Sequence, residues 1–481
     1  MALSSTDFSA AVFSDDRLRS RFRLLLDDLD AHPGCPLPQA CRSPAALKGA
    51  YRFLAHPASA VDNLLPAFVR PSIRRAIRRP VVLAVHDSAS FNYSSLEKTD
   101  GLGFINDSPT AKGLHLHSSL LLDEDCHLIG LAHLHFWTRP IFRVESDQEV
   151  RELPIEQKES YKWLIGIRAT ATAFAGEAAK PPRIIHVMDR EGDIHEVFAE
   201  VRRLGHGAVI RCAQDRRVEG DEPDQIERAK RRVEVTRPLG TIPLRVPLKG
   251  GGHRIAQVEV RTREVRLRPN EKKHRGRRPL KLWLVEAREV STPPEGEKAA
   301  KWWLWTTLAV RKLEKVRRVL SIYRARWRIE EYHRMMKTGC GVEKLRLDGA
   351  DKLMKVITMQ AWVATRVVQI RDEVRRDPLQ GCEACFRPAE WKLLWARQKR
   401  RGWREGDGIP SLGEVVKWLG RLGGHQGRKG DGMPGAELMS RGLYALDLLL
   451  EGQHLARLDQ ASTAEEPSPP PHSPSHQNPR G

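Results

Sequence analysis

Four side chains that offer an acid, two cations and a phenol follow one another at helical spacing between residues 321 and 344. They are Tyr323, Arg326, Glu330 and Lys337. The stretch lacks proline, has no glycine before Gly339 and predicts a helix up to about Lys337. Spacings of three, four and seven residues place all four on one helix face. Such a face suits an anionic, metal-dependent substrate such as a phosphodiester, whereas a solvated face with ordinary ion pairs is the alternative.

The quartet also resembles a known signature. The pattern Tyr-x2-Arg-x3-Glu-x6-Lys, within Tyr-x-x-Arg-Trp-Arg-Ile-Glu-Glu and followed by Lys-Thr-Gly, is similar to the Y-R-E-K signature of bacterial DDE transposases of the IS-four and Tn-five type. Four residues in fixed order with matching flanks are more specific than a three-residue pattern. The resemblance implies a ribonuclease-H-like catalytic core in which Glu330 is the last of three metal-binding carboxylates.

Composition favours a nucleic-acid partner. Of the 481 residues, 40% are hydrophobic and 30% charged, and the net charge is +20. No apolar run approaches a membrane span and the N-terminus is not a signal peptide, so we expect a cytoplasmic, nucleoid-associated bacterial protein with no membrane partner. Seven scattered cysteines, including the lone CxxC of Cys382 and Cys385, indicate neither a disulfide scaffold nor a metal site.

The two upstream acids are expected where buried strands end. The apolar run 80–85 predicts a buried strand ending at His86-Asp87-Ser88. An acid in that place is often only a turn residue, but the resemblance puts the first carboxylate at Asp87. Residues 184–188 predict another strand, followed by Asp189-Arg-Glu-Gly-Asp193. Glu191 or Asp193 could also ligate metal by residue type, but the strand end favours Asp189, as does the resemblance.

Further core strands are predicted at 113–122, 128–136, 208–211 and 301–307. The resemblance implies that Arg211 contacts transposon-end DNA and that Trp302 stacks on a base flipped out of the duplex; a core tryptophan is the alternative. Alternation places Trp303 and Trp305 on the opposite face from Trp302. Histidines also alternate along the first two of these strands, and we interpret them as polar surface and not as a metal cluster: His115, His117, His133 and His135.

Between residues 213 and 300 the pattern changes to a β-rich insertion. Alternation of period two predicts strands at 232–236, 242–248, 255–267 and 280–287, with a hairpin turn at 249–252. The loop 270–278 is strongly basic.

Residues 1–75 are expected to form a helical DNA-binding domain. The stretch Ser43–Leu54 resembles the N-terminal DNA-binding module of the same transposases. Its core is predicted to include Tyr51, Phe53 and Leu54. The candidates for phosphate contact are Arg42, Lys48 and Arg52. Five arginines between residues 70 and 79 are also expected to touch the DNA backbone.

The expected domain order is this N-terminal domain, a catalytic core at 76–372, a helical dimerisation domain at 373–457 and a disordered tail at 458–481. The fold class is therefore α/β, a ribonuclease-H-like core with a β-rich insertion between helical domains. An exposed apolar helical face is predicted to serve dimerisation; its residues are Trp391, Leu393, Leu394, Val415, Val416 and Trp418.

Together these features predict a cut-and-paste transposase. The resemblance implies that the three carboxylates Asp87, Asp189 and Glu330 hold two Mg²⁺ ions, with Mn²⁺ able to substitute. It further implies terminal-phosphate contacts from Tyr323, Arg326 and Lys337, cutting through a hairpin and joining to target DNA by a DNA-bridged homodimer. The alternatives are a nuclease with the same core, disfavoured by the quartet and Trp302, and an inactive DNA-binding derivative, disfavoured by the intact carboxylates.

Overall fold

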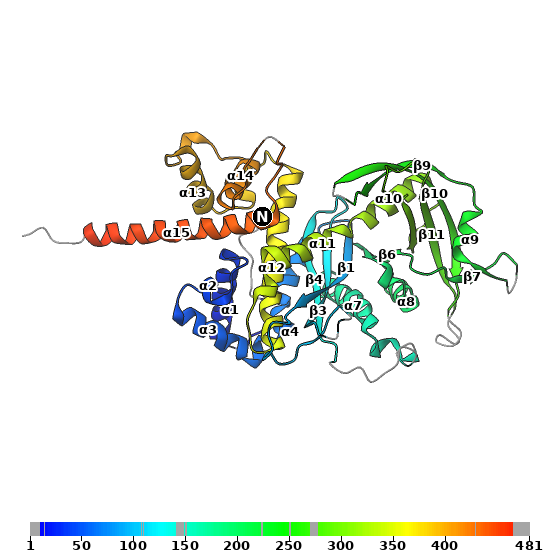
Figure 1. Cartoon of the computed structure of the whole chain (residues 1–481), viewed down its shortest axis with the longest axis horizontal. Helices are drawn as coiled ribbons and strands as arrows, with labels where there is room; N and C mark the ends of the chain where they lie inside the picture. Colours follow the sequence, from blue (N-terminus) through cyan, green and yellow to red (C-terminus); the bar gives the residue numbers. More distant parts are fainter. Residues whose placement is uncertain are drawn as a thin grey trace, which may run out of the picture.

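The computed structural model describes residues 10–464 apart from 14, 107, 109, 141–148, 150–151, 223–224, 250–251, 270–277 and 429. These residues build one twelve-stranded mixed sheet, with helices on its faces and helical segments before and after it (Figure 1). Most of the predicted basic loop, at 270–277, and residues 465–481 of the predicted tail lie outside the described residues.

The centre of the sheet has the strand order β4-β3-β1-β5-β6. These strands are β1 (Val81–Asn92), β3 (Lys112–Leu122), β4 (Leu128–Trp137), β5 (Arg183–Met188) and β6 (Gly207–Arg211), with the short β2 (Gly103–Phe104) beside β3. The β1–β5 and β5–β6 pairs are parallel, whereas β1–β3 and β3–β4 are antiparallel. This is the expected ribonuclease-H-like arrangement, and the four strands predicted between residues 113 and 211 are confirmed.

The first strand is longer than predicted. Its parallel pairing with β5 ends at Val85, but its antiparallel pairing with β3 continues to Asn92 opposite Gly113. Asp87 therefore lies within a strand and not after its end, because one neighbour still supports the backbone there.

The insertion extends the same sheet. Its elements, together with the strand that follows it, are β7 (Arg217–Glu219), β8 (Ile226–Arg228), α9 (Ala229–Glu234), β9 (Gly240–Pro247), β10 (His253–Leu267), β11 (Leu280–Glu289) and β12 (Lys301–Thr306). Since β12 pairs with β6 on one side and β11 on the other, core and insertion are continuous. The β9–β10 hairpin is confirmed. The strand predicted at 232–236 is wrong: Ala229 and Val233, four residues apart, are both buried on α9.

Helices cover both faces of the sheet. One face packs on α7 (Lys162–Ala175), α8 (His195–Arg203) and α9, and its core includes Trp303 and Trp305. The opposite core includes Leu304, with Trp302 packed against it, so the predicted alternation along β12 is confirmed. The helices that follow β12 are α10 (Leu313–Arg324), α11 (Trp327–Arg334) and α12 (Ala350–Arg376).

The N-terminal segment is helical, as predicted. Its helices are α1 (Asp16–Ala31), α2 (Leu37–Ala40), α3 (Pro44–Ala55), α4 (Val61–Leu64) and α5 (Pro66–Ala76). Ser43 caps α3 by accepting a hydrogen bond from the Ala46 amide at 3.1 Å. Phe53 and Leu54 are buried as predicted, but Tyr51 is 39% exposed. It lies three residues after the exposed Lys48, on the outer face of the helix.

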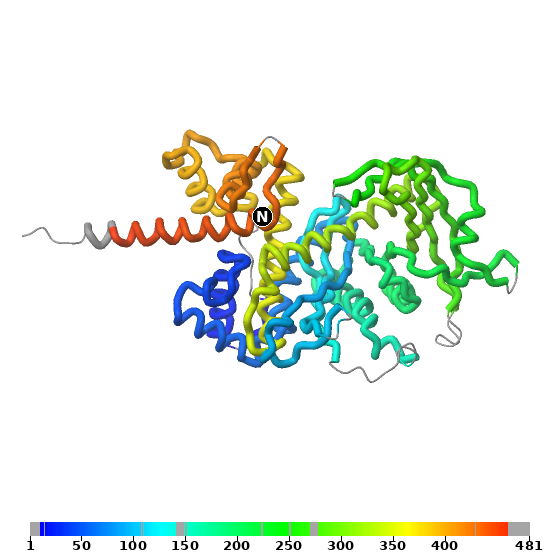
Figure 2. Tube along the Cα trace, viewed as in Figure 1, coloured from blue at the N-terminus to red at the C-terminus, as the bar shows by residue number. Residues whose placement is uncertain are grey.

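The C-terminal helices are α13 (Pro388–Lys399), α14 (Leu412–Leu422) and α15 (Ala436–Ala464). The predicted exposed apolar face is wrong, because Trp391, Leu394, Val415, Val416 and Trp418 are all buried and Leu393 is half-buried. These side chains form the segment's own core. The last helix continues beyond residue 457 and projects away from the molecule (Figure 2). No helix among the described residues is long and apolar enough to cross a membrane.

The 27-residue helix α12 joins the segments. It lies between the N-terminal helices and the sheet and also contacts α14 and α15 (Figure 1). Its buried Lys355 donates through Nζ to the Leu54 carbonyl at 2.9 Å. Its Arg366 forms a mostly buried ion pair with Asp30 of α1, and Glu390 of α13 lies 3.9 Å from the same guanidinium. Arg366 thus compensates Asp30, while the closer partner of Glu390 is Arg387 at 2.8 Å.

We predict that Arg366→Met destabilises the protein by about 3–5 kcal/mol at pH 7, because it leaves the mostly buried Asp30 carboxylate without its cation, whereas Glu390 keeps Arg387 at 2.8 Å. Urea denaturation measures the effect. On the same helix, Lys352 pairs with the exposed Asp348 at 2.8 Å, so Lys352→Met should cost no more than about 1 kcal/mol.

The deficit should also depend on pH. Burial raises the pKa of Asp30, and the loss of Arg366 raises it further. A carboxyl whose pKa is higher in the folded state destabilises the fold as the pH rises through that pKa. The deficit of Arg366→Met relative to the parent should therefore shrink as the pH falls below 7 and Asp30 becomes protonated. A deficit independent of pH would contradict this account.

Candidate active site

Two of the predicted carboxylates lie at the same level of the central sheet. In the parallel pair of β1 and β5, Val85 is opposite Val187. Asp87 and Asp189 each follow two residues later. Both side chains are therefore expected at the same end of the strand pair and on the same face of the sheet. Asp189 also caps the turn η5 (Arg190–Gly192), where its Oδ1 accepts from the Glu191 amide at 2.8 Å. Backbone pairing therefore fixes both side chains.

Arg326 connects the third carboxylate to the first. Its Nη1 donates to Asp87 Oδ2 at 3.1 Å, and its Nη2 donates to Glu330 Oε1. The Arg326 side chain is mostly buried, and Glu330 lies one turn later on α11. One guanidinium thus ties the α11 region to strand β1.

The like charges perturb one another. Burial, with repulsion from Asp189 and Glu330, raises the pKa of Asp87 to about 6, although the Ser88 amide and Arg326 oppose the shift. Burial also raises the pKa of Asp189. A divalent cation would relieve this repulsion, and carboxylate oxygens are the ligands that Mg²⁺ prefers. The donor set therefore fits a hard metal ion.

The quartet is not carried by one regular helix. Tyr323 lies near the end of α10, and the Arg326 amide bonds to the Tyr323 carbonyl at 3.1 Å in a tight turn before α11. Beyond α11, the π-helical turn η6 (Met335–Gly339) carries Lys337. The predicted continuous helix is thus wrong in detail. Lys337 Nζ lies 5.8 Å from the ring centre of Phe91 and 3.8 Å from Glu343. Phe91 follows Asp87 by four residues on β1, so Lys337 lies further along this strand than the first carboxylate.

Beside the carboxylates, Arg211, Trp302 and Tyr323 form one cluster. The Trp302 and Tyr323 rings meet edge to face at 5.4 Å, and the Arg211 guanidinium lies 5.6 Å and 5.9 Å from their centres. Trp302 is half-buried, so part of its ring remains accessible. Sequence analysis missed Trp327, which is 52% exposed with Arg326 stacked 5.4 Å from its ring. Trp327 lies between Arg326 and Arg328 in the motif, and this position could have indicated it as a candidate.

The neighbouring acids are engaged elsewhere. Asp193 is buried and accepts from the Ala213 amide at 2.8 Å and from Arg216 Nε at 2.6 Å, which holds the loop after β6. Glu191 is mostly exposed and bonds Lys162 Nζ at 3.1 Å. These contacts account for both residues without a metal.

The N-terminal candidates lie on or just before α3, which is separated from the central sheet by α12 (Figure 1). Lys48 and Arg52 are exposed on α3, and neither has an ion-pair partner among the described residues. Arg42, in contrast, donates through Nη2 to both carboxylate oxygens of Asp447 on α15, at 2.9 and 2.8 Å.

The histidines of β3 and β4 are more buried than predicted. His117 is fully buried and His115 nearly so, which contradicts the surface interpretation for these two. His117 Nδ1 shares a hydrogen bond with Ser88 Oγ at 3.0 Å, and burial lowers its pKa.

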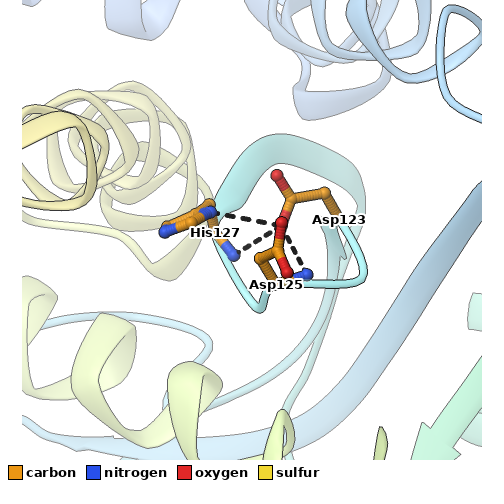
Figure 3. Close-up of side chains that lie close together, drawn as sticks. All are labelled: Asp123, Asp125 and His127. Carbon is orange, nitrogen blue, oxygen red and sulfur yellow. Dashed lines mark hydrogen bonds and ion pairs between the residues drawn. The ribbon is translucent and has the colours of Figure 1, made fainter. Parts of the chain in front are cut away.

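Three side chains of the β3–β4 turn lie as close together as metal ligands do: Asp123, Asp125 and His127 (Figure 3). However, Asp123 Oδ1 accepts from the amides of Asp125 at 3.1 Å and His127 at 2.9 Å, which is the bonding of a turn-forming aspartate (Figure 3). The turn follows Leu122, which pairs with Leu83 at the opposite end of β1 from Asn92. It is therefore separate from the three predicted carboxylates.

Comparisons with known proteins match three parts of the chain and leave residues 60–184, which include Asp87, outside the family models. The family model "Transposase DNA-binding" matches residues 1–59, "Transposase DDE domain" matches 185–365, and "Transposase Tn5 dimerisation domain" matches 359–463, beginning within α12. A solved structure entitled "Cryo-EM structure of piggyBac transposase synaptic complex with hairpin DNA" aligns with 98% of this chain and 81% of that chain, at a TM-score of 0.39 and 9% identity. That likeness is too weak to bear on function.

The three family models follow one another along one chain, and together they include the DNA-binding, catalytic and dimerisation parts of a transposase. The protein belongs to the DDE transposases of the Tn5/IS4 family, enzymes that use divalent metal to cleave and transfer DNA strands.

Proposed function

We propose that this protein performs cut-and-paste transposition: it binds the inverted repeats at transposon ends, cleaves them through a hairpin and joins the freed 3′ ends to target DNA. The observation that supports this most directly is the level placement of Asp87 on β1 and of Asp189 immediately after β5, with Glu330 joined to Asp87 through Arg326. A site that gathers three acids around one arginine suits phosphoryl transfer.

In this proposal, Asp87, Asp189 and Glu330 hold two Mg²⁺ ions, and Mn²⁺ substitutes. When bound, the ions activate the attacking oxygen and neutralise charge on the phosphodiester. Arg326 offers a planar fork of donors that matches a phosphate group. Tyr323 and Lys337 add a hydroxyl donor and a point charge on either side of it, and position the terminal phosphate.

Two surfaces contact the transposon end. On α3, Lys48 and Arg52 flank the exposed Tyr51 and face the duplex backbone. Near the carboxylates, Trp302 stacks on a flipped base, with Arg211 and Tyr323 supporting its ring.

The carboxylates are tested by isosteric substitution. We predict that Asp87→Asn, Asp189→Asn and Glu330→Gln each abolish Mg²⁺-dependent nicking of an end-containing duplex, while gel-shift affinity changes by no more than a few fold. Each variant keeps the shape of the side chain but loses the charge that binds metal.

Glu191→Gln is the matched control, because this acid lies two residues after Asp189 but bonds Lys162. It should retain nicking. Substantial cleavage by one of the three carboxylate variants would remove that residue from the proposed triad, and cleavage by all three would leave a DNA-binding protein with different chemistry.

Trp302 is tested by separating two steps. We predict that Trp302→Ala leaves first-strand nicking largely intact and lowers hairpin formation about tenfold or more, because only the hairpin requires the distorted end and stacking of one base is worth about 1–3 kcal/mol. Denaturing gels resolve nicked from hairpin products. If thermal denaturation shows that the variant is unfolded, or if both steps fall equally, the residue belongs to the core.

Dimerisation is proposed to use the projecting part of α15. Leu448, Leu455 and Leu458 follow one another at seven- and three-residue spacing on this helix, and all three are exposed. Such a stripe matches the seam of a helix pair. It replaces the α13–α14 face that the sequence predicted, since that face is buried within the chain.

We predict that Leu455→Glu with Leu458→Glu abolishes the paired-end complex but not binding of a single end. These leucines are 58% and 54% exposed, so charge there costs the monomer little. Light scattering with end DNA measures the stoichiometry. Leu379→Glu is the control, because Leu379 is 83% exposed but lies after α12, off the stripe. Pairing that survives the double change would place the dimer contacts elsewhere.

A further inference from the structure

A cavity of about 420 Å³ lies between α5, the β3–β4 turn and the end of α12, and arginines line it from two of these elements. We refer to it as the arginine pocket. Its charged lining residues are Arg75, Arg78, Arg79, Arg376, Asp123 and Glu373.

The two acids of the pocket are already compensated. Arg376 donates through Nη1 to Glu373 Oε1 at 3.0 Å and through Nη2 to Asp123 Oδ2 at 3.4 Å. Asp123 also accepts two amides of its own turn (Figure 3). The remaining three arginines are therefore left with positive charge that no acid of the lining balances.

Arg75 is the most unusual of the three. Its Nε and Nη2 donate to the Ile129 carbonyl at 3.2 and 3.0 Å, and it has no carboxylate partner among the described residues. Burial lowers its pKa, and no neighbouring acid opposes the effect. Although Arg75 is only half-buried, holding its cation partly away from water without a counterion has a cost. An anion in the cavity would remove that cost.

The arginine pocket is not part of the carboxylate site. The turn that forms one wall follows Leu122, which pairs with Leu83. Asp87 lies four residues further along β1, which is about 13 Å at the rise of an extended strand. The pocket adjoins α5, shortly after the DNA-binding match, and α12, where the dimerisation match begins.

We propose that the arginine pocket binds a phosphate of the duplex DNA backbone, at a site distinct from the catalytic centre. The planar guanidinium group of arginine matches the geometry of phosphate oxygens. Arg78 and Arg79 line the pocket and are exposed, so they can also contact adjacent phosphates of a bound duplex. Free phosphate has the same chemistry. DNA is the favoured source because this family binds DNA and the protein carries a net charge of +20. The inference rests on DNA binding and not on the proposed strand chemistry.

The test compares two double variants of the same basic run. Arg78→Ala with Arg79→Ala removes two charges from the pocket. Arg70→Ala with Arg74→Ala removes two charges from the same region, but these arginines pair with Glu177, at 3.7 and 3.2 Å, outside the pocket. Fluorescence anisotropy with an end-containing duplex in EDTA measures affinity over a salt series, so that catalysis plays no part.

At physiological salt, the pocket variant should bind the duplex at least about tenfold more weakly than the parent. A plot of log K against log salt concentration should have a slope that is shallower by about 1–2, because each phosphate contact contributes about 0.9 to that slope. The control should stay within about threefold of the parent. Ethylation interference should show one or two phosphates whose modification weakens the parent but no longer affects the pocket variant.

Equal losses in both double variants would mean a general charge effect and overturn the proposal, as would an unchanged pocket variant. Inorganic phosphate, titrated at constant ionic strength, separates the two sources. Saturable phosphate binding that requires Arg78 and Arg79, with unaltered DNA affinity, would make the pocket a small-anion site and overturn the assignment to DNA.

Discussion

Burial of the Asp87 and Asp189 carboxylates, with repulsion from Asp189 and Glu330 acting on Asp87, is the constraint on which the rest of this site depends. The parallel pairing of β1 and β5 ends at Val85 and Val187, and Asp87 and Asp189 follow at the same level two residues later, where burial raises the pKa of both. Neither can turn away without breaking strand pairing or the cap of the η5 turn. The Arg326 guanidinium partly offsets this cost by bridging Asp87 and Glu330. A site that is electrostatically unfavourable without added cations is suited to binding them.

The position of Arg326 in turn depends on α12. Arg328, two residues later, pairs with the buried Asp372 of α12, whose other oxygen accepts from the Leu128 amide of β4 at 2.8 Å. Tyr332 donates to the Ala361 carbonyl at 3.2 Å. The helix break before α11 and the π-helical turn after it divide the quartet among α10, the turn, α11 and η6, while Arg328 and Tyr332 anchor α11 to α12. Irregular turns of this kind often occur at functional sites.

The strands and the acids that they present could be predicted because buried runs such as 80–85 and 184–188 have few other solutions. The failures share a physical cause. The alternation of polar and apolar residues at 232–236 suggested a strand, but it covers only five residues. The four-residue spacing of the apolar Ala229 and Val233 favours a helix, which is what forms. The apolar face around Trp391 and Trp418 was correctly recognised as apolar, but pattern alone does not say whether another segment or a second chain covers it. Here α12 to α15 cover one another.

A net charge of +20 favours a polyanionic partner, but only the pairing of its cations indicates where that partner would bind. Arg42, Arg70 and Arg74 belong to the same basic N-terminal region as Lys48, Arg52, Arg78 and Arg79, yet all three are engaged by acids from α15 or by Glu177. Among the described residues, Lys48 and Arg52 on α3 and Arg78 and Arg79 just after α5 have no ion-pair partner. Arg42 can reach a phosphate only if its bond to Asp447 opens, so DNA binding through that residue is coupled to the position of α15. Contacts that hold the fold together thus select which charges remain for DNA.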